Sequence, residues 1–202
     1  MTMNDLLVPY LSYDEIRKHA ENFLYQYNIN DTIPVPIEKI IEIDLNISLI
    51  PIPGLLEAFN TDGFISNDFK SISIDLNIFY NIETRSRFTL THEIGHMILH
   101  RPIWEGLFFS NITEWKQMES SFSTKQYQYL EGQANKFAGL VLAPSPHLNE
   151  KFKEAKEKVL KSGFELDADP DLFYGYIRRF LAQEFFVSED TIRFRLDYEN
   201  LN

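Results

Sequence analysis

The spacing of apolar residues changes along this chain, and the changes predict its elements. Apolar positions at helical intervals follow Ser12, which has capping-box spacing to Glu15, so a helix is expected to begin there. A short helix is predicted at 37–43. Short apolar runs bounded by turn residues then predict strands, which lie at 47–50, 64–66 and 71–75. A small sheet is therefore expected in the first half of the chain.

Two long helices are predicted after these strands. The first runs from about Glu83 to His100 and stops before Pro102, because the residue preceding a proline disfavours helical backbone. The second spans roughly Thr124–Leu142 and ends at Pro144. The pattern predicts an α+β fold that is mainly helical, with a small β-sheet preceding the first long helix.

The segments around the long helices are predicted as follows. Residues 101–124 are expected to be irregular, and their aromatic side chains are expected to pin the segment to the core rather than line a groove. These aromatic residues are Trp104, Phe108, Phe109, Trp115 and Phe122. Further helices are predicted to start at Ser145-Pro146 and Asp169-Pro170. Residues 181–196 indicate a helix, a turn and a second helix capped by Ser188.

Composition narrows the class of protein. A length of 202 residues suits one domain over 1–202, made of an N-terminal helical part (1–30), a core (33–144) and a helical C-terminal part (145–202). Nineteen basic and 30 acidic residues give a net charge of −11, which makes nucleic-acid binding by the whole chain unexpected. The chain contains neither a secretory signal pattern nor an apolar run long enough to span a membrane, so a cytoplasmic location is expected.

The segment His92-Glu93-Ile94-Gly95-His96 carries the strongest chemical signal. Residues four apart stack on one face of a helix, so His92 and His96 can both bind one Zn²⁺. The chain has no cysteine, so any metal must be held by His, Asp or Glu. Glu93 lies beside this pair and is the candidate general base for a peptide hydrolase.

A hydrolytic zinc site needs a third protein ligand. His100 is four residues beyond His96, and three ligands on one straight helix would span about 11 Å, too far for one ion. We therefore expect His100 to be packed or to support a ligand. Among the downstream acids, which include Glu105 and Glu114, Glu131 is the best candidate and Glu119 the second. Asn135 shares a helix face with Glu131 and can hydrogen-bond a ligand histidine.

These motifs resemble the ImmA/IrrE family of metallopeptidases. The resemblance rests on Arg87–His96 with Leu99-His100, and on Glu131–Pro144. It implies a zincin-like fold of the gluzincin type, with His92, His96 and Glu131 as zinc ligands and Glu93 as catalytic acid and base. It also implies an intracellular endopeptidase that cleaves a helix-turn-helix repressor and so derepresses its genes.

Two rival functions remain open from the sequence. One is a non-catalytic, zinc-bearing regulator that binds a repressor or antitoxin-like partner. The other is a DNA-binding regulator that uses the C-terminal helix pair, where Arg193 and Arg195 lie on the second helix. In that pair Phe186 takes the place of the expected turn glycine and several acidic neighbours would repel phosphate, so a packing or substrate-docking role is favoured. For the oxyanion donor, the sequence does not choose among Tyr127, Tyr129 and the C-terminal tyrosines.

Overall fold

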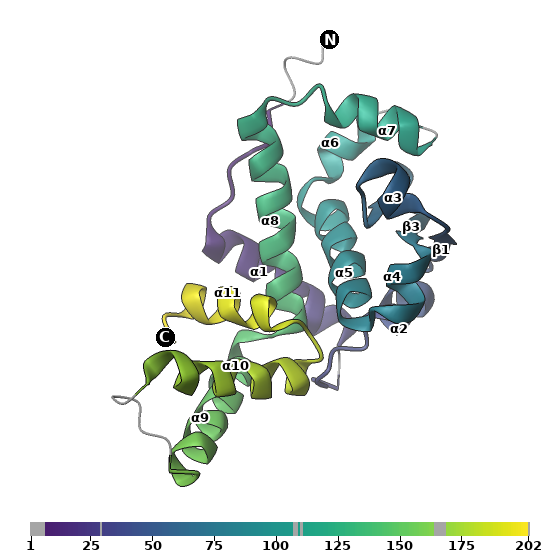
Figure 1. The fold of residues 1–202 in the computed structure, drawn as a ribbon. Coiled ribbons are helices and arrows are strands. Elements are labelled where there is room, and N and C mark those ends of the chain that lie inside the picture. Colours follow the sequence, from purple (N-terminus) through teal and green to yellow (C-terminus); the bar gives the residue numbers. More distant parts are fainter. Residues whose placement is uncertain (1–6, 29, 107–108, 110, 164–168, 202) are drawn as a thin grey trace.

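A small sheet and a set of helices build the molecule (Figure 1). The computed structural model describes residues 7–28, 30–106, 109, 111–163 and 169–201. Its strands are β1 (Ser48–Ile52), β2 (Gly63–Ile65) and β3 (Ser71–Asp75). Their order is β1-β3-β2, with β1 parallel and β2 antiparallel to β3. The α+β, mainly helical fold expected from the sequence is confirmed.

Helices account for most of the described chain. They are α1 (Tyr13–Tyr27), α2 (Ile37–Lys39) with its π-helical continuation η2 (Ile40–Asp44), α3 (Leu55–Phe59), α4 (Leu76–Asn81), α5 (Glu83–Leu99), α6 (Arg101–Glu105), α7 (Ile112–Glu119), α8 (Thr124–Leu142), α9 (Ser145–Lys161), α10 (Pro170–Phe185) and α11 (Glu189–Glu199). Over the described residues, no helix is both long enough and apolar enough to cross a bilayer.

Helices α5 and α8 form the central pair of the fold. They lie side by side, with the sheet against α5 and α1 against α8 (Figure 1). Both are covered on several sides, and their apolar residues join one buried cluster that includes Leu90, Ile94, Phe137 and Val141. Burial of these side chains stabilises the pair by roughly 1.5–3 kcal/mol for each large residue. The central pair therefore provides a rigid frame on which side chains can be positioned.

Asp75 connects the sheet to two short helices. Its carboxylate accepts backbone N–H groups from Leu56 at 3.0 Å, from Asn77 at 2.9 Å and from Ile78 at 3.2 Å. These bonds, the one from Leu56 first, lower the pKa of Asp75. One carboxylate thus caps α4 and holds the start of α3 against the end of β3.

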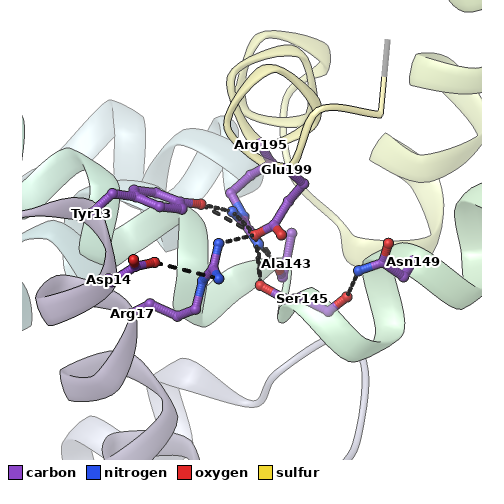
Figure 2. A network of polar contacts seen from close by, with 8 residues as sticks. All are labelled: Tyr13, Asp14, Arg17, Ala143, Ser145, Asn149, Arg195 and Glu199. Atoms are coloured by element: carbon purple, nitrogen blue, oxygen red, sulfur yellow. Dashed lines mark hydrogen bonds and ion pairs between the residues drawn. The ribbon is translucent and has the colours of Figure 1, made fainter.

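A buried arginine anchors helix α11 to the rest of the fold (Figure 2). The Arg195 guanidinium donates to the carbonyl of Ala143 at 3.0 and 3.1 Å, to Ser145 Oγ at 3.0 Å and to Glu199 Oε1 at 2.9 Å. It also contacts the hydroxyl of Tyr13 on α1. Because Arg195 is only 3% exposed, it is not available to a DNA phosphate, and its contacts favour the packing role expected for this end of the chain.

The turn between α10 and α11 contains a non-glycine residue in the left-handed region. Phe186 has φ 55° and ψ 54°, the conformation that glycine adopts without steric cost. Arg87 on α5 donates to the Phe186 carbonyl at 3.2 Å, and its guanidinium lies 5.6 Å from the centre of the Phe186 ring. Tertiary contacts from α5 therefore hold a conformation that the local sequence disfavours.

Two of the predicted segments need correction. Residues 101–124 are not irregular, because α6 and α7 form within them. The prediction that the aromatic residues pin this segment is confirmed for Trp104 and Phe109, which are buried. Trp115 is buried as well but also lines a cavity, and Phe108 lies outside the described residues. The strand predicted at 47–50 runs as β1 from Ser48 to Ile52, so Pro51 does not end it.

Candidate metal centre

Helix α5 directs two imidazoles to the same point. His92 and His96 are one turn apart, and their Nε2 atoms lie 2.9 Å from each other. The His96 ring is almost fully buried, and the indole of Trp104 stacks on it with ring centres 4.7 Å apart. The sequence prediction that these histidines share a face is therefore confirmed.

Helix α8 brings Glu131 to this pair. Its carboxylate oxygens lie 3.2 Å from His92 Nε2 and 3.5 Å from His96 Nε2. Gly95 favours the close approach of α8 to α5, because a Cβ atom there would make tight contacts of 3.2 Å with both Ala134 Cα and Phe137 Cδ1. The glycine inside the His-Glu-x-x-His segment is thus a sequence signal for the second helix.

The three side chains fit a zinc ion. Two imidazole nitrogens and a carboxylate oxygen are donors that zinc accepts, and the ligand atoms all lie within 4.8 Å of one another. Ligands of a tetrahedral zinc with bonds of 2.0–2.1 Å are about 3.3 Å apart, close to the spacings observed. Asn135 Oδ1 lies 2.9 Å from His92 Nδ1, so this nitrogen donates and Nε2 keeps the lone pair that a metal requires.

The electrostatics of the cluster favour a positive charge. Burial lowers the pKa of His92, but Glu131 opposes this effect and raises the value to about 9. Burial lowers the pKa of His96 well below its ordinary value and that of His100 to about 4. The cluster thus combines two neutral imidazoles at His96 and His100 with a centre at His92 and Glu131 that attracts a proton or a cation.

Glu93 lies beside the cluster in a buried position. It is 6% exposed, and its Oε2 accepts the backbone N–H of Ile65 on β2 at 2.9 Å. Burial raises the pKa of Glu93 to about 8, whereas neighbouring His92 lowers it. This bond fixes one oxygen and leaves the other free to accept a proton. A carboxyl group with a pKa near neutrality is suited to general acid–base work.

A cavity of about 480 Å³ opens onto the cluster. It is bounded by residues before and within β2, by α5, by α7 and by residues of α8 from Tyr127 to Asn135. On the α7–α8 side, Tyr127 donates to Glu119 Oε1 at 2.5 Å, and Lys116 Nζ lies 2.6 Å from Glu119 Oε2. Glu119, the second candidate for third ligand, is thus engaged by Lys116 and Tyr127, and it is not in the three-residue cluster.

The two candidate oxyanion donors on α8, Tyr127 and Tyr129, differ in their position relative to the cavity. Tyr127 lines it, whereas Tyr129 packs its ring edge-on against Tyr10, with centres 5.8 Å apart. Sequence reasoning missed Lys116, because a lone lysine on a short helix carries no motif.

A second groove of about 730 Å³ shares Asp62, Phe88, Thr89 and Asn135 with the first and extends to α11. The two cavities therefore adjoin each other at these shared residues.

A helix with His92-Glu93 and His96, facing an acid on a neighbouring helix, defines a potential metal site of the metallopeptidase kind. The chain belongs to the Peptidase M78 family, because the model of the IrrE N-terminal-like domain matches residues 77–197. This match includes the four residues of the predicted catalytic and metal site.

Comparison with solved structures gives the same kind of fold in a larger protein. A Mycobacterium tuberculosis transcriptional regulator superposes with a TM-score of 0.55 at 14% identity. The match covers 93% of this chain and 47% of that one, so this chain spans about half its length. Such low identity shows the fold alone. No curated protein sequence matched this chain.

Proposed function

We propose that this protein is a zinc-dependent endopeptidase that cleaves a helix-turn-helix transcriptional repressor. The observation that carries the proposal is the convergence of His92, His96 and Glu131 beside the buried Glu93 in one cavity. When bound, zinc supplies Lewis-acid chemistry, which polarises a peptide carbonyl and makes water more acidic. The other parts of the reaction fall to side chains of this protein.

Glu93 is the proposed general base and acid. It takes a proton from the water that attacks the peptide carbonyl and returns it to the leaving amine. The backbone N–H of Ile65 donates to Oε2 of Glu93 at 2.9 Å and so restricts the carboxylate to one orientation. Because the carboxylate is already oriented, proton transfer costs less conformational entropy.

Tyr127 is the proposed donor to the oxyanion that forms on the attacked carbonyl. Tyr127 lines the cavity, and burial raises its pKa, so its hydroxyl stays protonated and can donate. Glu119, which also lines the cavity, accepts a hydrogen bond from this hydroxyl. During the reaction the Tyr127 hydroxyl would stop donating to Glu119 and would donate to the developing oxyanion instead.

Three observations support a repressor as the substrate. The net charge of −11 suits a basic partner, and DNA-binding domains carry basic surfaces. Strand β2 lies at an edge of the sheet and lines the cavity with Gly63 and Phe64, so an extended segment of a substrate can align along it. The family and the name of the transcriptional regulator with the same fold agree with a role in gene regulation.

The test is cleavage of a helix-turn-helix repressor encoded beside the gene. We expect the zinc-loaded protein to produce two fragments whose masses add up to the repressor plus one water. Chelator-treated protein is expected to produce none, and added zinc should restore them. Mass spectrometry of the intact products measures this. Cleavage that survives full removal of metal would overturn the proposal, and a stable uncut complex with zinc-loaded protein would favour the non-catalytic regulator.

A further inference from the structure

A chain of hydrogen bonds runs from the N-terminal segment 8–9 to a predicted zinc ligand. We infer that His100 and Gln133 are positioning residues that fix His96 in the tautomer needed to bind a metal. We also infer that the Pro9 carbonyl sets the direction of the chain. This inference rests on the proposed metal site, and it assigns a role to residues that lie outside that site.

The direction of each bond follows from which groups can donate. The Pro9 carbonyl can only accept, so the Gln133 nitrogen that lies 2.9 Å away donates to it. This orientation turns Gln133 Oε1 toward His100 Nε2, at 3.0 Å. An amide oxygen can only accept, so His100 Nε2 must carry the hydrogen.

The same reasoning continues to the metal centre. His100 is 1% exposed, and a neutral ring with its hydrogen on Nε2 has a lone pair on Nδ1. That Nδ1 lies 3.0 Å from His96 Nδ1, which must therefore donate. His96 then keeps its lone pair on Nε2, the atom that faces His92 and Glu131. Three consecutive bonds thus prepare one ligand atom.

The two ligand histidines obtain their tautomers in different ways. His92 is partly exposed and needs a single acceptor, Asn135. His96 is deeper and donates to another histidine, which is itself ambivalent between donor and acceptor until Gln133 restricts it. This difference explains why a buried histidine and a buried glutamine lie behind the deeper ligand. Such supporting partners typically contribute a factor of about 10–100 to metal affinity.

A matched pair of variants separates this role from simple docking of the N-terminal segment. Gln126 also holds the segment, through the N–H of Val8, but has no bond to His100. We expect Gln133→Leu to weaken zinc affinity about 10- to 100-fold and Gln126→Leu to leave it within about twofold. Competition with a chromophoric zinc chelator measures both affinities without any substrate. Equal zinc affinities for Gln133→Leu and wild type would overturn the inference while leaving the proposed function intact.

A second measurement uses the unaltered chain, so that it does not depend on how a variant folds. In zinc-loaded protein with ¹⁵N-labelled histidine, long-range proton–nitrogen spectra report which ring nitrogen carries the hydrogen. We expect His100 to be protonated on Nε2 and His96 on Nδ1. A His100 ring with its hydrogen on Nδ1 would overturn the proposed direction of the chain, whether or not the protein cleaves peptides.

Discussion

Glu93→Gln is expected to abolish peptide cleavage while the protein keeps its zinc. Glutamine has nearly the shape of glutamate, and its amide oxygen can still accept the N–H of Ile65, which lies 2.9 Å from Oε2. The amide cannot take a proton from water, so the general-base contribution is lost, and kcat should fall by about 10²–10⁴-fold or more. Cleavage rates of the repressor and metal content per molecule measure the two halves of this prediction.

The control for Glu93→Gln is the same chemical change outside the cavity. Glu105→Gln removes an exposed carboxylate whose observed contact is an ion pair with Arg101 at 3.4 Å. Its cleavage rate and zinc content should match those of the wild type. Full activity in Glu93→Gln would contradict the proposed mechanism. Loss of zinc from that variant would mean instead that Glu93 helps to hold the metal.

Arg195→Met is expected to lower the free energy of unfolding by about 3 kcal/mol, because it removes one partner of an ion pair and leaves a buried carbonyl without its donors. The change would remove one of the two arginines that pair with Glu199, leaving Arg17 at 3.3 Å, and would leave the Ala143 carbonyl without the two donor groups of Arg195 (Figure 2). Methionine replaces much of the apolar stem, so the loss comes from the polar head. Denaturant unfolding followed by circular dichroism measures the change.

Arg193→Met provides the comparison on the same helix. Arg193 is half-exposed and pairs with Asp190 at 3.1 Å on the surface, so its loss should change the free energy of unfolding by no more than about 0.5 kcal/mol. Equal effects of the two substitutions would contradict the role assigned to the buried network. Salt-sensitive DNA binding that depends on Arg195 would contradict it as well, because it would require this side chain to be accessible.

The elements that could be predicted from the sequence are those with local signals. Ser12 with Glu15 caps α1, and the prolines near 102 and 144 end α5 and α8 where expected. Helix α7 was missed because it is short and its aromatic residues do not repeat at a clear interval. A signal for it exists, since Asn111 caps the helix by accepting the N–H of Glu114 at 3.0 Å.

Strand β1 shows why Pro51 was misinterpreted. Proline cannot donate a backbone hydrogen bond, and it is therefore read as the end of a strand. β1 lies at the edge of the sheet and pairs with β3 alone, so Pro51 can continue it without leaving a central partner unsatisfied. Whether a strand is central or at an edge depends on tertiary pairing, which the local sequence does not contain.

The residues of the candidate site also differ in whether local sequence or tertiary packing determines their position. His92 and His96 follow from the geometry of a single helix, so spacing alone predicts that they meet. The position of Glu131 depends on the distance between α5 and α8, which the absence of a side chain at Gly95 favours. The bonds from His100 to Gln133 and from Gln133 to Pro9 join residues 33 and 124 positions apart. Contacts of that range follow from the packed fold rather than from a motif.

Zinc on the His92–His96–Glu131 cluster is the condition for every step proposed for catalysis. The most direct test is an anomalous difference map, measured at the zinc absorption edge, from crystals grown with zinc. We expect one strong peak within about 2.0–2.2 Å of His92 Nε2, His96 Nε2 and a Glu131 carboxylate oxygen. A map with no peak there, or with the zinc held elsewhere in the chain, would contradict the assignment of this cluster as the metal centre.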